Sequence, residues 1–381
     1  MSSVKSIMIR RVYRRVRVFV QAAVLCVLGG CAVVQPATAA GSRGESSGEN
    51  DAMHRDATPR DATRQDAAHR DPLYQELLAE LTAPGFDPFV TDTPKIRDYY
   101  RSVIGSVPSM EHRVGTVRSG TVTIAVHLFE PVGTAPEGTV LVLHGYLSWP
   151  GEMGSMIRAF VEEGYLVVAP ALPGHGLSGG EPAGIEDFSD YGRVVSDVLE
   201  ALDAGPYREN GLPRPWHAVG HSTGATAVYE YVRGYSPGEP DPFQAVVFLA
   251  PLVRSAWYRM SRAGRFLARP FVTEIPSGTD HPMIPETMPL SWFDAQVRWN
   301  RRARSYPVVT RPVLVIQGDA DTVVAWRYNR RFLNRKFACL RYELLRGAGH
   351  VLHGRDRAVR ETTLGLTTEY IVTWPAGVDC R

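Results

Sequence analysis

The chain has 381 residues, of which 44% are hydrophobic and 22% are charged, an ordinary globular composition with room for one large domain and additional segments. Its 42 basic and 40 acidic residues give a formal net charge of +2. That balance excludes the strongly basic composition typical of nucleic-acid-binding proteins, so we expect no nucleic-acid partner.

The amino terminus has the pattern of an export signal. Six Lys and Arg residues lie between positions 5 and 17, a largely apolar run covers 18–28, and Gly-Gly-Cys follows at 29–31. This is the order of a secretory signal, and the apolar run is too short to span a bilayer comfortably. Residues 28–31 also resemble a bacterial lipobox. That resemblance implies a signal over residues 1–30, lipidation of Cys31 and, with Ala32 next, an outer-membrane location.

A second cleavage site leaves an alternative open. Residues 37–39 form an A-x-A site, and cleavage after Ala39 would give a secreted or periplasmic protein without a lipid. In either case residues 41–71 contain almost no large apolar side chains and are rich in Gly, Ser, Asp and Arg, so we expect a disordered tether, which covers residues 31–71 when Cys31 is the first mature residue. The folded domain is then predicted over residues 72–381.

Two cysteines remain in the predicted domain, Cys339 and Cys380. Export makes a disulfide between them chemically feasible, and such a bond would fix the carboxyl terminus. The alternative is one buried thiol and one exposed thiol.

The predicted domain begins with helices and continues as alternating strands and helices. Helices are expected at 72–81 and at 94–103, the second with Thr93 as N-cap and Pro94 in its first turn. Alternating strands at 114–117 and 122–129 then form a hairpin. Buried strands are expected at 138–143, 164–169, 218–219, 245–249, 312–317 and 341–345, with helices at 153–163, 188–202 and 225–232. This alternation predicts an α/β fold with a mainly parallel central sheet and helices on both faces.

A cap insertion is expected at about residues 253–310. About sixty residues separate the strand that ends at 249 from the one that begins at 312, which is long for a plain connection. No clean strand is visible there, whereas 258–268 and 292–304 have helical patterns. Seven apolar side chains either line a pocket beneath this cap or pack it onto the main domain: Met260, Phe266, Phe271, Met283, Met288, Trp292 and Phe293.

A G-x-S-x-G motif at 220–224 places Ser222 between a strand-like run and a helix-compatible run. Such a serine projects its hydroxyl at the carboxyl edge of a sheet. The backbone N–H of Thr223, at the start of the helix, points to the place where negative charge develops on an attacked carbonyl. By itself the motif is equally compatible with a simple turn before a helix.

Acidic and histidine residues follow the last two strands. Asp319 and Asp321 come after the strand at 312–317, and His350 follows the one at 341–345. Both positions lie at the same edge of a parallel sheet as Ser222. A serine hydroxyl is a weak nucleophile and needs a base such as His350, and a carboxylate then holds that base in the right tautomer.

From about residue 113 onward the chain resembles the α/β-hydrolases, and within them the monoacylglycerol lipase and lysophospholipase group, which is also grouped with the serine aminopeptidases. The resemblance rests on His-Gly-Tyr at 144–146, Gly-His-Gly-Leu-Ser at 174–178, the motif at 220–224, G-x-x-D-x-x-V at 318–324 and Gly-His at 349–350. The G-x-x-D spacing selects Asp321 as the acid over Asp319. The resemblance implies that the backbone N–H groups of Tyr146 and Thr223 form an oxyanion hole.

The resemblance implies a serine hydrolase that cleaves carboxylic esters through an acyl-enzyme, with a small acyl ester or lipid as substrate and a membrane reached through the lipid anchor. The alternatives are a peptidase or amidase on the same triad and a non-catalytic binding module of the cell envelope. We expect no cofactor, and no metal site because no residue cluster has metal-ligand spacing. His144 and His175 are expected to be structural, and His353 to be exposed. The oligomeric state stays open.

Overall fold

The computed structural model describes residues 71–105, 110–205, 211–234, 242–256, 258 and 272–373. The expected signal, Cys31, nearly all of the tether and Cys380 lie outside these residues. Within the described part of the chain, no helix combines the length and the apolar character that crossing a membrane requires.

A central eight-stranded sheet organises the fold, in the order β1-β2-β4-β3-β5-β6-β9-β10. The first two pairings, β1 with β2 and β2 with β4, are antiparallel, and all later pairings are parallel. Its strands are β1 (Met110–Ser119), β2 (Val122–Pro131), β3 (Thr139–Leu143), β4 (Leu166–Pro170), β5 (Trp216–His221), β6 (Phe243–Leu249), β9 (Val309–Gly318) and β10 (Phe337–Leu345). The mainly parallel sheet expected from the sequence is confirmed.

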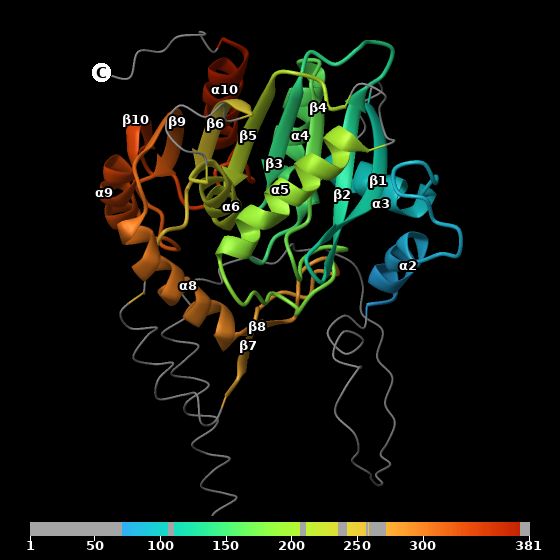
Figure 1. The fold of residues 1–381 in the computed structure, drawn as a ribbon, viewed down its shortest axis with the longest axis horizontal. Coiled ribbons are helices and arrows are strands. Elements are labelled where there is room, and N and C mark those ends of the chain that lie inside the picture. Colours follow the sequence, from blue (N-terminus) through green and yellow to red (C-terminus); the bar gives the residue numbers. More distant parts are fainter. Residues whose placement is uncertain are drawn as a thin grey trace, which may run out of the picture.

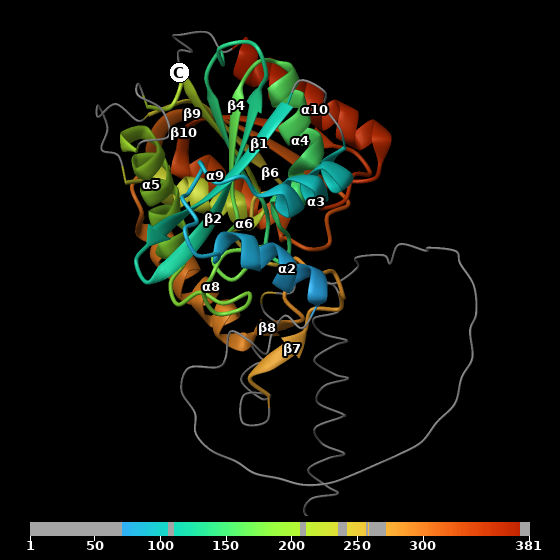
Figure 2. The ribbon, with the colours of Figure 1, turned by 90° about the vertical axis from the view of Figure 1, so that its right-hand side faces the viewer.

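Helices cover both faces of this sheet, which Figures 1 and 2 show from two sides. Every residue of β3, β4 and β5 is buried, as expected for strands covered twice. Successive side chains of β3 alternate between two apolar cores: Leu141 and Leu143 pack with α5, α6, α8 and α9, and Val140 and Val142 pack with α2, α3, α4 and α10. These helices are α2 (Pro72–Leu81), α3 (Pro94–Ile104), α4 (Gly154–Glu162), α5 (Ser189–Ala204), α6 (Thr223–Val232), α8 (Leu290–Arg302), α9 (Trp326–Lys336) and α10 (Arg357–Val372).

Local chemistry explains where several elements begin. Asp71 is the N-cap of α2 and its carboxylate accepts from Leu73 N at 2.8 Å, which satisfies one of the free N–H groups of the first turn. Thr93 stands at the N-cap of α3 as expected, but its side chain makes no capping bond. Asp356 caps α10 by accepting from Val359 N at 3.1 Å. The helices α9 and α10 were not identified from the sequence.

The segment between β6 and β9 holds α8, a short 3-10 turn (Ala303–Ser305) and a two-stranded antiparallel sheet of β7 (Glu274–Pro276) and β8 (Thr287–Pro289). Only helices were expected here from the sequence, so these two short strands are a correction. The helix expected at 258–268 falls almost entirely outside the described residues. In Figure 2, α8, β7 and β8 lie together at one end of the sheet.

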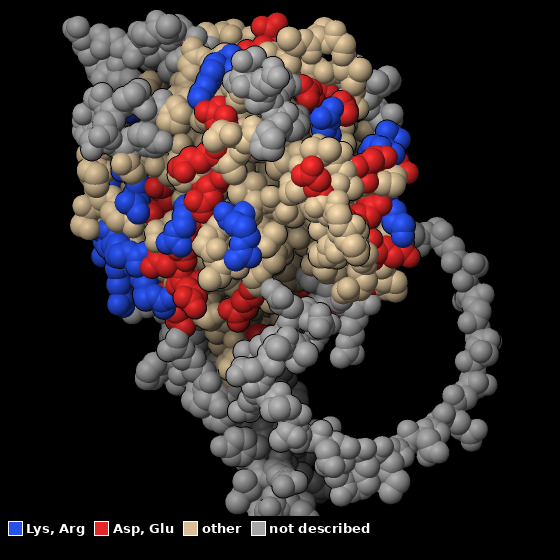
Figure 3. All heavy atoms as spheres, turned by 45° about the vertical axis from the view of Figure 1, so that its right-hand side comes forward, with Lys and Arg blue, Asp and Glu red and all other residues tan. Residues whose placement is uncertain are grey.

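The surface is mixed in charge. On the face shown in Figure 3, acidic and basic side chains are interspersed, with a gathering of Lys and Arg at its lower left. Among the described residues, several opposite charges are paired, including Arg97 with Asp92 at 2.6 Å and Arg113 with Glu111 at 2.9 Å. Charges of both signs are therefore mixed on this face, as they are in the whole sequence.

Candidate active site

Ser222 occupies a sharp turn between β5 and α6. Its backbone has φ 51° and ψ −110°, a region that residues with a side chain rarely adopt. Two hydrogen bonds fix this strained backbone to the segment after β6: Ser222 N donates to Leu249 O at 2.9 Å, and Ser222 O accepts from Leu252 N at 3.1 Å. The serine residue is 6% exposed. The turn therefore presents the hydroxyl at the carboxyl edge of the sheet in a fixed position.

Gly224 allows α6 to begin directly against β3. A Cβ at this position would lie 2.4 Å from Leu143 O and 2.6 Å from His144 O, closer than atoms can approach. The small residue in the G-x-S-x-G motif is therefore required by the close approach of two backbones. This contact brings the end of β3 beside the start of α6.

Asp321 and His350 meet at the same edge of the sheet. His350 Nδ1 donates to Asp321 Oδ2 at 2.8 Å, and the side chains are 11% and 0% exposed. The other Asp321 oxygen accepts from the backbone N–H groups of Val323 and Val324 at 2.8 and 3.0 Å. This arrangement leaves Nε2 of His350 as the ring nitrogen that can accept a proton.

The environment of Asp321 favours its ionised form. Burial by itself would raise the pKa of this carboxyl, but the hydrogen bond and charge of His350, the Val324 N–H and the amide of Gln317 outweigh burial and lower the pKa below its ordinary value. An ionised carboxylate can hold the Nδ1 proton and stabilise an imidazolium.

Asp319 has a different role. Its carboxylate accepts from the backbone N–H of Gly347 at 2.7 Å, and its own N–H donates to Leu345 O at 3.1 Å. It thus joins the turn after β9 to the loop that carries His350. The structure places Asp321, not Asp319, against the His350 ring.

His221, the residue before Ser222, contacts His350. The Nε2 atom of His221 lies 3.2 Å from His350 O, and the two rings have centroids 4.9 Å apart. Among the described residues, no hydrogen bond joins the Ser222 hydroxyl to the His350 ring. Such catalytic contacts are often long in enzymes without substrate and tighten when it binds.

The loop after β3 lies directly beside the serine. A Cβ on Gly145 would lie 3.3 Å from Ser222 Cβ and 2.9 Å from His221 Nδ1. The next backbone N–H, that of Tyr146, makes no hydrogen bond within the described part of the chain. The N–H of Thr223, the first residue of α6, has no intrahelical acceptor. The two predicted oxyanion donors thus belong to backbone segments on either side of Ser222.

His144 orients the first of these donors. Its Nδ1–H donates to Gly145 O at 2.7 Å, and its Nε2 accepts from Leu172 N at 2.9 Å. Because a trans peptide unit is planar, holding the carbonyl of Gly145 also sets the direction of the Tyr146 N–H. Burial, followed by the nearby His175, lowers the pKa of His144 to about 3, so its ring is neutral as these two bonds require.

His175 supports the same loop from the other side. Its Nε2 accepts from Leu147 N at 3.2 Å, and its Nδ1–H donates to Pro173 O at 2.9 Å. Leu147 has a positive φ of 50°, so the chain turns sharply just after Tyr146. Both histidines act as structural hydrogen-bonding residues, as the sequence analysis expected.

His353 was expected to be exposed, and that prediction is wrong. The residue is 4% exposed, and its ring stands edge-on to His221 with centroids 4.6 Å apart. Burial and the neighbouring His350 lower its pKa to about 4. The loop after His350 folds inward, which three-residue spacing alone does not reveal.

Four of the seven apolar side chains assigned to the cap are described, and all are at most 5% exposed: Met283, Met288, Trp292 and Phe293. They pack in the two apolar cores with residues of the main domain. Met260, Phe266 and Phe271 lie outside the described residues.

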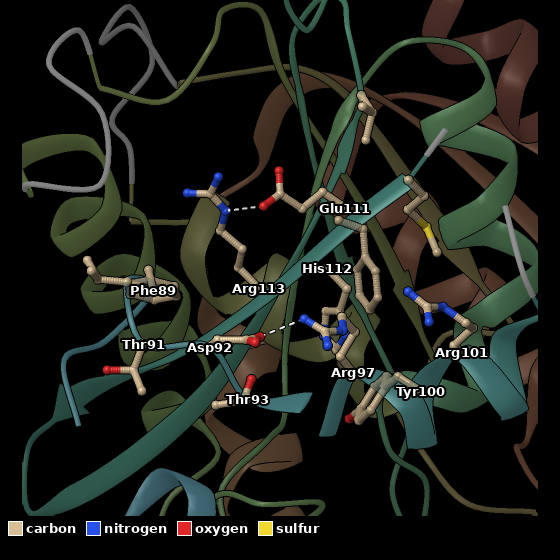
Figure 4. Close-up of a pocket in the computed structure, with 14 residues that line it drawn as sticks. Phe89, Thr91, Asp92, Thr93, Arg97, Tyr100, Arg101, Glu111, His112 and Arg113 are labelled. Atoms are coloured by element: carbon tan, nitrogen blue, oxygen red, sulfur yellow. Dashed lines mark hydrogen bonds and ion pairs between the residues drawn. The ribbon is translucent and has the colours of Figure 1, made fainter. Parts of the chain in front are cut away.

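A cavity of about 750 Å³ lies elsewhere, between α3, β1 and the segment 89–93 (Figure 4). The edge strand β1 is separated from β5 by β2, β4 and β3 in the sheet. Arg97 and Arg113, which line this cavity, are paired with Asp92 and Glu111. No residue predicted for catalysis lines it.

Two other predictions concern metals and cysteines. In the described ranges, no group of three or more His, Cys, Asp or Glu side chains could hold a metal ion. Cys339 is disulfide-bonded. Its expected partner, Cys380, is outside the described residues, so the pairing stays a prediction.

Known proteins resemble this chain in sequence and in structure. Residues 134–281 match a family model described as "Serine aminopeptidase, S33". The monoacylglycerol lipase of Mycolicibacterium smegmatis is 32% identical over 136 residues, 36% of this chain but only 45% of that protein. Human monoglyceride lipase is 28% identical over 257 residues, 59% of this chain and 78% of that protein.

One solved structure shows the likeness of fold. A soluble variant of the monoglyceride lipase of Saccharomyces cerevisiae, in complex with a substrate analog, has a TM-score of 0.56 and 16% identity. The match covers 70% of this chain and 97% of the yeast protein.

A mainly parallel sheet between two layers of helices, with a strained serine turn after β5, is the architecture of the α/β-hydrolases, and this chain has that fold. In sequence it is similar to the serine aminopeptidase family model over residues 134–281 and to monoacylglycerol lipases. The fold expected from the sequence is confirmed, and so is the expected resemblance to monoacylglycerol lipases.

Proposed function

We propose that the protein is a serine hydrolase that cleaves carboxylic esters through an acyl-enzyme intermediate. The observation that carries the proposal is the hydrogen bond of 2.8 Å between His350 and the buried carboxylate of Asp321, at the edge of the sheet where Ser222 stands on its strained turn. Nucleophilic catalysis by a serine requires a base held by a carboxylate at the edge where the serine stands, and this arrangement supplies both.

Each step of the proposed reaction has a residue. His350 takes the proton of the Ser222 hydroxyl through Nε2 while the serine oxygen attacks the ester carbonyl. Asp321 stabilises the imidazolium that forms. The N–H groups of Tyr146 and Thr223 donate to the oxyanion. His350 then gives its proton to the departing alcohol. In the second half, a water gives a proton to His350 and attacks the acyl-enzyme, and His350 returns that proton to the Ser222 oxygen as the carboxylic acid leaves.

The substrate class is proposed from the relatives. Two of the similar sequences are named as monoacylglycerol or monoglyceride lipases, so we propose a monoacylglycerol or a lysophospholipid as the ester. A panel of p-nitrophenyl esters of increasing chain length, alongside monoacylglycerols and lysophospholipids, tests this. A preference for acetyl over all longer esters would contradict a lipid substrate.

The test of the chemistry is Ser222→Ala. The variant is expected to lose both ester hydrolysis and labelling by a fluorophosphonate. Ser102→Ala, which removes an exposed hydroxyl bonded only to Tyr99 O in α3, serves as the control and should keep both. Activity that survives Ser222→Ala would end the proposal. A folded wild-type protein that hydrolyses nothing and does not label would favour a binding module instead.

One observation favours a second activity on the same triad. The family model that matches residues 134–281 is described as a serine aminopeptidase. Aminoacyl amides should therefore be measured beside acyl esters. Faster turnover of the amides would replace the esterase proposal with a peptidase.

We also propose that the protein is held in the bacterial cell envelope by a lipid on Cys31. The lipobox-like residues 28–31 support this, and several acyl chains would give stable attachment at about 0.8 kcal/mol for each buried methylene. Incorporation of labelled palmitate that disappears in Cys31→Ser is the expected result. A mature protein that begins at Ala40 without a label would contradict it.

A further inference from the structure

The aromatic ring of Tyr146, whose N–H is a proposed oxyanion donor, is covered by a residue of the segment between β6 and β9. Trp292, in the first turn of α8, stacks on this ring with 3.8 Å between centroids and 20° between planes. The stacking partner thus comes from the segment between β6 and β9, 146 positions further along the chain (292 − 146). Nothing in its sequence position links it to the loop after β3.

Trp292 is itself held in place. It is 3% exposed, and its indole N–H donates to the hydroxyl of Tyr191 in α5 at 3.0 Å. Phe188 and Phe293 pack around it, with ring centroids 5.2 and 5.1 Å from the indole. The indole face that meets Tyr146 therefore has a fixed position relative to the main domain.

The Tyr146 ring has two further contacts. Its hydroxyl donates to Ala183 O at 3.0 Å, and its edge meets His175 with 5.4 Å between centroids. Together with Trp292, these contacts hold the ring at its face, its edge and its hydroxyl. Because the ring is joined to the backbone through only two rotatable bonds, a held ring restricts the Cα and the N–H of the same residue.

We propose that Trp292 is a positioning residue for the oxyanion hole, acting through the Tyr146 ring on the Tyr146 N–H. The inference rests on the proposed ester hydrolysis. His144 sets the direction of the donor from the β3 side, and Trp292 holds it from the α8 side. Donors contribute to rate only when they already point to where the charge develops, so releasing the ring lowers the rate of the chemical step.

The chain offers a matched control on the same helix. Trp299 lies two turns further along α8, is 0% exposed, and its indole N–H donates to Glu230 Oε1 at 2.6 Å. Glu230 also binds Arg233, and Trp299 packs on Phe188 and Tyr229. Both tryptophans therefore fasten α8 to the main domain by burial and one hydrogen bond. Trp292 alone is stacked on Tyr146.

The experiment measures kcat and KM for a short soluble p-nitrophenyl ester. In Trp292→Ala, kcat is expected to fall about 10- to 100-fold with KM within about threefold of wild type, since a donor misplaced by an ångström costs on this scale. Trp292→Phe, which keeps a stacking ring, should recover most of the loss. Trp299→Ala should keep kcat within about threefold of wild type, although it is less stable.

The affinity for a transition-state mimic is a second measurement, and a loss of protein stability alone would not change it. A boronic acid forms a tetrahedral adduct on the serine, and its affinity should fall in Trp292→Ala in proportion to kcat/KM. Equal losses of kcat in Trp292→Ala and Trp299→Ala, or an effect confined to KM, would overturn the inference.

The other outcomes are also decisive. If Trp292→Ala does not fold, Tyr146→Leu replaces it, because it removes the partner ring and keeps the N–H donor. A kcat within about threefold of wild type in that variant would overturn the inference. Failure of the wild-type protein to hydrolyse esters or to label with fluorophosphonate defeats the proposed function. A normal wild type with an unaffected Trp292→Ala defeats only the role of Trp292.

Discussion

Asp319 and Asp321 stand two residues apart on one turn and bind different parts of the same neighbouring loop: Asp321 accepts from the ring of His350, and Asp319 accepts from the backbone N–H of Gly347. One carboxylate thus acts on the imidazole, and the other holds the loop that carries it. This division of roles can be tested directly.

Asp321→Asn is expected to lower kcat by about 10⁴-fold, because the amide stabilises the wrong tautomer of His350 and cannot support an imidazolium. Asp319→Asn retains an oxygen that can accept from Gly347 N, so its kcat should stay within about tenfold of wild type. Steady-state kinetics of the two variants decide the matter. The reverse ranking would show that Asp319 is the acid of the triad.

Gly145→Ala should lower kcat by about 10² or more, because the added methyl group must displace Ser222, His221 or the donor N–H of the next residue. Gly365→Ala is the matched control, since a Cβ there meets nothing within 4 Å and α10 gains a better helix former. That control should keep full activity and unfold at a slightly higher temperature. Normal turnover by Gly145→Ala would mean that the loop after β3 is free to move aside.

Buried histidines make the folded state sensitive to acid. Burial, the first cause in each case, lowers the pKa of His144 to about 3, and the pKa of His217 and His353 to about 4. In the unfolded chain these groups have a pKa of about 6.5 and bind protons that the folded state excludes. The free energy of unfolding should therefore fall as the pH drops from about 6.5 towards 4, by at most about 1.4 kcal/mol per pH unit for each group. Denaturant titrations at pH 7, 6 and 5 measure this.

His217→Leu should stabilise the protein and flatten this pH dependence. His217 lies in β5, is 1% exposed, and neither ring nitrogen has a partner among the described residues. Removing two unpaired polar atoms should raise the free energy of unfolding at pH 7 by about 1 kcal/mol, with a larger gain at pH 5. Ester turnover should not change. A loss of stability at both pH values would indicate that the ring is hydrogen-bonded after all.

Cys380→Ser should release the thiol of Cys339 if the two are partners. A thiol reagent applied to the unfolded, unreduced protein is expected to find one thiol more in the variant than in wild type. Closing a loop of this size stabilises a protein by about 4 kcal/mol in the chain-entropy account, so the variant should also melt at a lower temperature. A count one thiol lower in the variant would mean that Cys380 is free in the wild type and that Cys339 is bonded to another cysteine.

The order of strands and helices could be predicted from the sequence because the patterns that indicate each element are local. Continuous apolar runs such as that in β3 indicate strands covered on both faces, and the spacing of Pro94 after Thr93 indicates a helix start. The placement of Asp321 and His350 at the edge shared with Ser222 then follows from parallel topology alone. The choice of Asp321 over Asp319 needed the family pattern, because two acids on one turn are equivalent in sequence.

Contacts between distant segments could not be read in this way. Trp292 and Tyr146 are joined only by the folded chain, and helical periodicity shows that Trp292 is buried but not what it touches. His353 lies in a loop whose composition is typical of exposed segments, but the path of that loop buries its side chain. The strands β7 and β8 have three residues each, too few for an alternating pattern to be visible.

The backbone contacts that hold the turn at residue 222 do not involve the Ser222 side chain. Backbone bonds from Leu249 and Leu252 fix it, and Gly224 gives it room. Whatever side chain stands at 222 is therefore carried to the same point in space, and a thiol or a carboxylate would meet the same base and the same donors. The backbone therefore fixes where the reactive group stands, and in the proposed mechanism the chemical identity of the group at 222 decides which reaction follows.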